Sequence, residues 1–390
     1  MIRLKKSEMN KFLIRGIYFV IRKFISSLVT IRKKRVLLVQ ESYSGSNTYA
    51  LSKLFSNSFK NKFDVILFKD GVENNFLQFI KKYILLASAK VILTTHASYK
   101  LKKQQVHFQL WHGPLIKKNG VMLSKKNNKF IVPKSWRKAD FILSYSNTYT
   151  TLMNACMVTD PKKYVVLGAP RNDFLYIKND RQVKNLIPEY HHYKRKVIIV
   201  PTMRFEEINT GDKSIIKKNT LYELFKNKKY SNFFLDKNTL NVIKPHPNDE
   251  AIIETIQDQF PSNIFVLTDK QLAKNKIDFY EILNVFDLLI TDYSSIFYDF
   301  LLLNKPIIFF HNEEDDIKYQ RDFLIESIAD FLPGKQTQSI DELAKLVIQS
   351  FDEEKKDKYF QKRREMKNLI HRYQDNKSTS RIENFIENFL

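Results

Sequence analysis

The sequence predicts an α/β protein in which two Rossmann-like domains face each other across a cleft, preceded by a basic amphipathic helix. Short apolar segments rich in β-branched residues alternate with segments able to form helices, which is typical of parallel sheets covered on both faces. The pattern stops in a polar stretch at 176–195 and then restarts. The length of 390 residues and the 43% of hydrophobic residues also suit two cores.

Residues 1–34 are expected to form the basic helix. The first 35 residues hold 11 Lys or Arg against one acidic residue, Glu8. No uncharged run approaches the ~20 residues that a membrane-spanning helix needs, and no signal-peptide cleavage site follows. The charge density favours a helix lying on an anionic membrane surface, whereas the alternative is a helix that packs on the protein's own body. Its apolar face is formed by Ile14, Ile17, Tyr18, Ile21, Phe24, Ile25 and Leu28.

The two domains follow from the positions of the apolar segments. The first domain, 35–178, is expected to contain strands at 35–40, 64–68, 90–95, 106–110, 140–145 and 164–168. A linker at 179–195 leads to the second domain, 196–365, with strands at 196–201, 240–247, 263–268, 286–291 and 306–310. Residues 366–390 are expected to form a C-terminal helix.

Ligands of open α/β sheets bind beyond the carboxyl ends of the strands, so the residues after each strand are the candidates for function. The segment 291–295, TDYSS, combines hydroxyls with a helix start, whose backbone N–H groups favour an anion. It could equally be simple helix capping, since Asp and Ser are good caps. The other such segments are WHGPLIKK (111–118), GAPRNDFL (168–175), PTMR (201–204) and KPHP (244–247). Together the second-domain segments predict a phosphate site.

Two of the eight histidines have a stiff neighbour directly after a strand. His112 precedes Gly and Pro, and His246 lies between two prolines, one histidine in each half of the chain. His96 and His311 also follow strand ends, but they lack such neighbours and no role is predicted for them. The sequence contains a single cysteine, Cys156, which excludes a disulfide framework and a metal cluster held by cysteines.

The net charge of +23 requires an anionic partner, which could be nucleic acid, anionic lipid or a phosphorylated substrate. Neither a GxGxxG nor a GxxxxGK[ST] motif is present, which disfavours a nicotinamide site and a P-loop. Zinc, helix-turn-helix and RNP signatures are also missing, so no nucleic-acid partner is expected.

Taken in order and at these separations, WHGPLIKK, GAPRND, PTMR, KPHP and TDYSSIFYDFLLLNKPIIFF resemble the CDP-glycerol glycerophosphotransferases over about residues 35–325. These are the primases and polymerases of wall teichoic acid, and relatives build capsules of similar polyol phosphates. The resemblance implies a GT-B fold, a CDP-glycerol or related CDP-alditol donor on the second domain, and release of CMP. It further implies a polyprenyl-diphosphate-linked acceptor on the first domain and a cytoplasmic enzyme held peripherally on the inner face of the cell membrane. It implies no cofactor and no metal.

The resemblance also assigns residue roles. His112 matches the general base, and His246 matches a histidine that contacts the donor's phosphates. Further expected contacts to those phosphates are Arg204, Asp292, Ser294 and Ser295. The acceptor is expected near the basic run that begins at Lys117 and Lys118, and near Arg171 and Asp173.

Some alternatives stay open. The family commonly has a Thr before the Pro of the WHG segment, whereas here Gly113 is followed directly by Pro114. Such departures leave the fold unaffected but allow ribitol or another alditol phosphate in place of glycerol phosphate. The rival functions are a nucleotide-sugar glycosyltransferase of the same architecture, a basic nucleic-acid-binding protein and a non-catalytic membrane scaffold.

Overall fold

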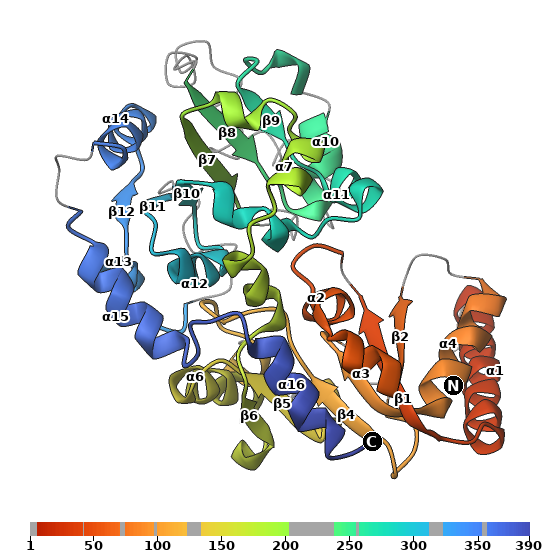
Figure 1. The fold of residues 1–390 in the computed structure, drawn as a ribbon. Helices are drawn as coiled ribbons and strands as arrows, with labels where there is room; N and C mark the ends of the chain where they lie inside the picture. Colours follow the sequence, from red (N-terminus) through yellow and green to blue (C-terminus); the bar gives the residue numbers. More distant parts are fainter. Residues whose placement is uncertain are drawn as a thin grey trace.

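The computed structural model describes residues 6–41, 43–70, 75–96, 100–122, 134–202, 238–254, 257–311, 323–352 and 357–390. Two six-stranded sheets, each wholly parallel, form the centres of two domains (Figure 1). Helices flank both sheets, and the fold is the GT-B arrangement of two Rossmann-like domains that the sequence predicted.

The first sheet has the order β2-β1-β3-β4-β5-β6. Its strands are β1 (Arg32–Gln40), β2 (Asp64–Lys69), β3 (Ala89–Thr94), β4 (Val106–Gln109), β5 (Phe141–Ser144) and β6 (Tyr164–Val166). Residues 36–39 of β1 are almost fully buried because helices cover both faces of the sheet, which explains the unbroken apolar run of this strand.

The second sheet has the order β12-β11-β10-β7-β8-β9. Its strands are β7 (Arg195–Val200), β8 (Thr239–Ile243), β9 (Ile264–Val266), β10 (Leu288–Thr291), β11 (Ile307–Phe310) and β12 (Lys335–Thr337). Every strand that the sequence predicted is present. The additional edge strand β12, Lys-Gln-Thr, lacks the apolar character on which the predictions depended.

Four helices of the first domain begin at capping side chains. Ser46, Ser56, Asn75 and Ser146 each accept a hydrogen bond from the backbone N–H three residues further on, which satisfies a donor that the helix itself leaves unpaired. The capped helices are α2 (Asn47–Leu54), α3 (Asn57–Lys62), α4 (Phe76–Ser88) and α6 (Asn147–Met157), and the domain also contains the short helix α5 (Lys134–Lys138).

The remaining helices follow the first domain in the chain. They are α7 (Asp180–Leu186), α10 (Glu250–Glu254), α11 (Asp269–Asn275), α12 (Ile296–Phe300), α13 (Ile328–Phe331), α14 (Ile340–Ser350), α15 (Phe360–Ile370) and α16 (Ser378–Glu387). The expected boundary at 365/366 falls inside α15, and the expected single C-terminal helix is interrupted after Ile370.

The last helix, α16, returns to the first domain (Figure 1). Its residues Ile382 and Ile386 are buried in the same core cluster as Phe108 and Ile142. Asp173 accepts hydrogen bonds from the backbone N–H groups of Ser378 (3.0 Å) and Thr379 (2.8 Å), and so holds the first turn of α16. The C-terminal residues therefore complete the first domain.

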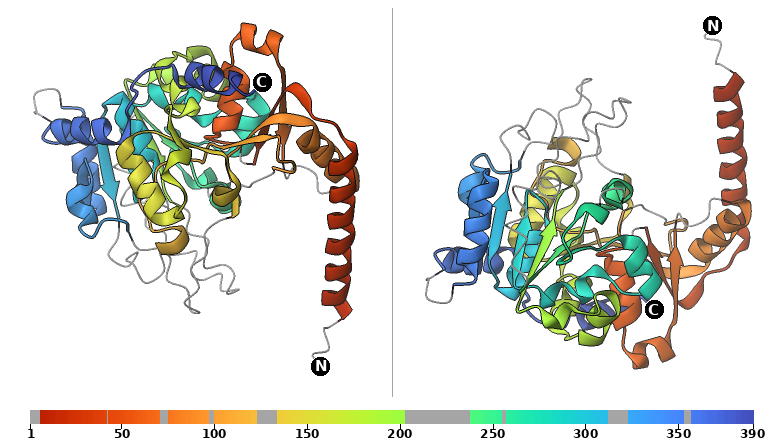
Figure 2. Two further views of the ribbon diagram at one scale, coloured as in Figure 1. Left: turned by 90° about the horizontal axis from the view of Figure 1, so that it is seen from below. Right: turned by 90° about the horizontal axis from the view of Figure 1, so that it is seen from above.

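The first helix, α1 (Lys6–Leu28), projects from the body of the protein and runs beside α4 (Figure 2). Tyr18 packs edge-on against Phe79 of α4, with ring centroids 4.4 Å apart, and Ile25 is buried. Other apolar side chains of both helices are exposed: Ile17, Phe19, Val20, Phe24 and Leu28 of α1, and Phe76, Leu77 and Ile84 of α4. Among the described residues, no helix is long and apolar enough to span a membrane.

Candidate functional site

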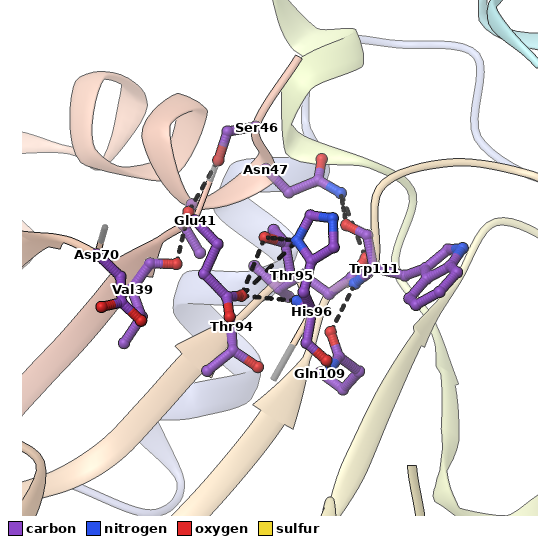
Figure 3. Close-up of polar contacts among 12 residues, drawn as sticks. Val39, Glu41, Ser46, Asn47, Asp70, Thr94, Thr95, His96, Gln109 and Trp111 are labelled. Atoms are coloured by element: carbon purple, nitrogen blue, oxygen red, sulfur yellow. Dashed lines mark hydrogen bonds and ion pairs between the residues drawn. The ribbon is translucent and has the colours of Figure 1, made fainter. Parts of the chain in front are cut away.

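The turn that carries His112 follows β4 and has an unusual backbone. Trp111 has φ +55° and Gly113 has φ +139°, and a bulky residue such as Trp rarely adopts the left-handed region. The side-chain amide of Asn47 donates to the backbone carbonyls of Leu110 (3.3 Å) and Trp111 (3.0 Å). Gln109 accepts from the Trp111 N–H at 3.0 Å (Figure 3). These contacts from α2 and β4 hold the strained turn in place.

His112 is an exposed residue of this turn. The ring contacts the indole of Trp111, with centroids 3.9 Å apart, and stacks on the ring of His96, with centroids 4.4 Å apart and an interplanar angle of 11°. Desolvation by the surrounding protein lowers the pKa of His112 from its usual 6.5, and the charges of His96 and Arg171 lower it further. A hydrogen bond to the Thr95 backbone opposes this shift. His112 is neutral at neutral pH and can accept a proton.

Arg171 binds the backbone of the turn that carries His112. Its Nη1 donates to the backbone carbonyls of His112 (2.6 Å) and Gly45 (3.0 Å), and its Nη2 pairs with Asp299 Oδ2 of the second domain at 2.5 Å. The residue is only 4% exposed. Because Arg171 is buried and both of its Nη atoms are bonded to protein groups, the guanidinium does not suit the expected contact with an acceptor. Its contacts join the turn of His112 to the second domain.

Asp173 requires the same correction. It is 1% exposed, and its carboxylate is occupied by the start of α16. The GAPRND segment therefore joins structural elements, because Arg171 and Asn172 reach Asp299 in the second domain while Asp173 reaches α16.

The TDYSS segment of the second domain lies against the turn of His112. A Cβ atom on Gly113 would lie 3.7 Å from Ser295 Oγ, so Gly113 and Ser295 are neighbours across the domain boundary. Ser294 and Ser295 are partly exposed, and the Ser295 side chain makes no cap hydrogen bond to α12. The helix has only five residues.

Asp292 has a structural role in this segment. It is fully buried, and it accepts hydrogen bonds from the backbone N–H (2.9 Å) and hydroxyl (2.5 Å) of Thr202. It thereby ties the segment after β7 to the segment after β10. A buried carboxylate with these partners does not suit the expected contact to a phosphate, since like charges repel.

His246 follows β8, at the same edge of the second sheet as Ser295. Burial and the neighbouring Lys244 lower its pKa, while Asp269 opposes this. Lys244 is buried and forms ion pairs with Glu250 (3.2 Å) and Asp269 (3.1 Å). The lysine contributes positive charge beside His246, and sequence reasoning did not assign it a role.

The predicted acceptor lysines lie at the domain junction. Lys117 bridges to Phe323 of the second domain through the backbone, and the Leu324 N–H donates to the Ile116 carbonyl at 3.0 Å. Both Lys117 and Lys118 are partly exposed. Arg204 lies outside the described residues, so its expected phosphate contact is not placed.

The structure thus brings His112, Ser294 and Ser295 to one junction and adds residues that the sequence did not single out. Asp299 was a lone carboxylate in the apolar run after TDYSS, which is a signal that could have been read. His96 follows β3, and no role was predicted for it because it lacks a stiff neighbour; Glu41 follows β1, so the rule for strand ends applied to it as well. Among the described residues, no group of three or more His, Cys, Asp or Glu is placed to hold a metal ion.

Comparison with known proteins identifies similar sequences. The family model for CDP-Glycerol:Poly(glycerophosphate) glycerophosphotransferase matches residues 24–388. A teichoic acid poly(glycerol phosphate) polymerase of Bacillus spizizenii is 27% identical, covering 76% of this chain and 78% of that protein. A teichoic acid glycerol-phosphate primase of Bacillus subtilis is 22% identical over 94% and 92% of the two chains. A teichoic acid ribitol-phosphate primase of Bacillus spizizenii is 25% identical over 78% and 76%.

Solved structures have the same fold. A variant of the wall teichoic acid polymerase TagF, soaked with CDPG, matches with a TM-score of 0.68 at 18% identity. The match covers 99% of this chain and 98% of that one, so it includes both domains and the returning C-terminal helix.

Proposed function

Because the chain belongs to the CDP-glycerol:poly(glycerophosphate) glycerophosphotransferase family and is therefore a CDP-polyol phosphotransferase, we propose that His112 is its general base. The reaction is transfer of glycerol phosphate from CDP-glycerol to an acceptor of teichoic acid synthesis, with release of CMP. We propose that the acceptor is lipid-linked.

The proximity of Gly113 and Ser295 is the observation that carries the proposal. Because of this proximity, the turn that carries His112 lies next to Ser294 and Ser295 of the second domain. A donor phosphate at Ser294 and Ser295 would lie beside the residue that activates the attacking hydroxyl. Both requirements of phosphoryl transfer, positioning and charge stabilisation, are then met at the domain junction.

The proposed reaction proceeds as follows. The acceptor hydroxyl gives its proton to His112, and its oxygen forms a bond to the donor's β-phosphorus. The bond from that phosphorus to the bridging oxygen breaks, and CMP leaves with the electron pair. Ser294, Ser295, His246 and Arg204 stabilise the charge on the phosphates, because fixed donors and cations do so without reorganising.

The bound donor would also adjust the base. Negative phosphates near an imidazole favour its protonated form and raise its pKa. His112, whose pKa is lowered in the free protein, would become a better proton acceptor once the donor is in place. Lys117 and Lys118 remain the proposed contacts for the acceptor's phosphates, since both are partly exposed at the junction.

We further propose that α1 and α4 hold the enzyme peripherally on the inner, cytoplasmic face of the cell membrane. The support is their shared set of exposed apolar side chains, together with the basic charge of the first 35 residues. One face of α1 packs on α4, and the exposed apolar side chains of the two helices are the surface proposed to contact the membrane.

The test is release of CMP from CDP-glycerol and from CDP-ribitol, with and without a polyprenyl-linked disaccharide that carries one glycerol phosphate. Acceptor-dependent release from CDP-glycerol supports the proposal, and its loss in His112→Gln supports the role of the base. Release from CDP-ribitol alone would favour the second candidate function, a ribitol-phosphate transferase. The similarity to a ribitol-phosphate primase is the observation that supports this candidate. Silence with both donors would contradict the proposal.

A further inference from the structure

The ring of His112 rests on a second imidazole that is itself held firmly. His96 comes from the end of β3 and stacks almost parallel on His112, with ring centroids 4.4 Å apart. The two histidines are far from adjacent in the chain, and they meet because β3 and β4 are neighbouring parallel strands. His112 therefore has one ring face against an aromatic neighbour from a different strand.

Both ends of the His96 backbone are hydrogen-bonded. Its N–H donates to Glu41 Oε2 at 2.7 Å, and its carbonyl accepts from Gln109 Nε2 at 3.2 Å. Gln109 also binds the Trp111 N–H, so one side chain links the two segments that carry the stacked rings. Figure 3 shows Glu41, Thr95 and His96 converging from the ends of β1 and β3.

The His96 side chain is also fixed. Its Nδ1 lies 2.9 Å from Thr95 Oγ1 and 3.7 Å from Glu41 Oε2. Thr95 Oγ1 in turn lies 3.5 Å from the same carboxylate oxygen. Glu41 is mostly shielded, with 13% of its side chain exposed, whereas 42% of the His96 side chain is exposed. The Glu41 carboxylate thus holds His96, whose ring stacks on His112.

We infer that Glu41 and His96 are positioning residues for His112: Glu41 anchors His96, and the stacked His96 ring holds the His112 imidazole in its working orientation. This inference rests on the proposed role of His112 as the base. An imidazole base must present one defined nitrogen to the acceptor hydroxyl, and a displacement of about 1 Å can cost about a hundredfold in rate.

Three contacts then define the position of the His112 ring, and one of them is the Trp111 indole described above. Thr95 takes a hydrogen bond from one ring nitrogen through its backbone, which leaves the other nitrogen to accept the proton. The His96 ring supports the flat face. The charged or titratable groups whose fields reach His112 are His96 after β3, Glu41 after β1 and Arg171 after β6. Protons on both stacked rings would repel, so His96 also favours the neutral form of His112.

Three substitutions in the full-length enzyme separate these effects. His96→Ala removes the stacked ring and is expected to lower kcat about tenfold, with the KM for the CDP-polyol changed less than twofold. His96→Phe restores a flat ring without a titratable charge, so it is expected to recover most of kcat. The acid limb of the kcat/KM profile of His96→Phe is expected at higher pH than in the wild type. The substitution removes the positive charge of His96 that lowers the pKa of His112. His191→Phe, at an exposed histidine far along the chain, is the matched control.

Glu41 is tested by a pair of variants. Glu41→Ala is expected to reduce kcat to a similar extent as His96→Ala, while Glu41→Gln, which keeps an oxygen for the His96 N–H, is expected to lose less. An activity-independent readout is NMR titration of histidine-labelled protein, with the His112 signal identified by its loss in His112→Gln. The pKa of His112 should rise in His96→Phe.

The outcomes distinguish the two proposals. If His112→Gln keeps the wild-type kcat, the proposed base is wrong. If His112→Gln is inactive but His96→Ala keeps a wild-type kcat and pH profile, His112 stands as the base and the positioning inference is overturned. A His112 signal that titrates identically in His96→Phe and the wild type would also contradict it.

Discussion

Arg171 and Asp299 form an ion pair of 2.5 Å that joins the two domains, with 5% of the arginine side chain exposed and none of the aspartate. Asp299 also accepts hydrogen bonds from Tyr280 (2.6 Å) and Asn172 (2.9 Å). The arginine reaches the His112 carbonyl from the other side. One buried charge pair therefore connects the donor domain to the backbone of the proposed base.

Asp299→Asn should destabilise the protein by about 3–5 kcal/mol, because it leaves the Arg171 charge buried without a counter-ion. Urea unfolding measures the change, and Asp330→Asn, at an exposed aspartate, is the control. A loss below about 1 kcal/mol would show that the pair does not hold the domains together.

Gly113→Ala should lower kcat/KM by about a hundredfold while the protein stays folded. The new Cβ would lie 2.7 Å from Arg171 Nη2, at a backbone angle that L side chains rarely adopt. Either the turn or the guanidinium must move, which displaces His112. The matched control is Gly16→Ala, since nothing lies within 4 Å of a Cβ at Gly16. Equal CMP release by Gly113→Ala and wild type would contradict the strained turn.

The pH dependence should differ between kcat/KM and kcat. The base is lost as the pH falls through the pKa of His112, because an imidazolium cannot accept a proton. In the free enzyme that pKa is lowered, so the acid limb of kcat/KM should lie below pH 6.5. The limb of kcat should lie higher, because the bound phosphates raise the pKa. Initial rates of CMP release give both profiles, and a kcat/KM limb above 6.5 would refute the assignment.

Binding to anionic vesicles should depend on the exposed apolar side chains of α1 and α4. The triple substitution Phe19→Ser, Phe24→Ser and Leu77→Ser should weaken co-sedimentation by more than about a hundredfold, since each large apolar side chain contributes about 1.5–3 kcal/mol on burial. Ile348→Ser with Leu369→Ser removes equally exposed residues elsewhere and should have no effect. If the triple variant still sediments, the membrane contact lies on another surface.

The strands and the order of the motifs were predictable because each depends on local sequence. Alternation of apolar runs locates strands, and the rule for strand ends then selects His112, His246 and TDYSS. The roles of Arg171 and Asp173 were not predictable in this way. Their partners, Asp299 and the start of α16, are distant in sequence, so only the folded chain shows that these charges are buried and bonded to protein groups.

The turn at Trp111 gives the same lesson on a smaller scale. Nothing in the letters W-H-G indicates a tryptophan at φ +55°, because that conformation is unfavourable for the residue alone. It exists because Asn47 and Gln109 bind the backbone around it. Tertiary contacts decide the geometry of this turn, whereas local sequence indicates only that a turn is present.

The return of α16 to the first domain has a consequence for how the chain folds during synthesis. Ile382 and Ile386 fill the core built by β4 and β5, so that core remains open while the ribosome makes the entire second domain. Until α16 is made, part of the apolar surface of the first sheet stays uncovered. Contacts between residues so far apart in the sequence form slowly. The last helix to be made therefore completes the first domain, and a chain that stops before residue 378 would contain the second sheet but leave the core of the first domain open.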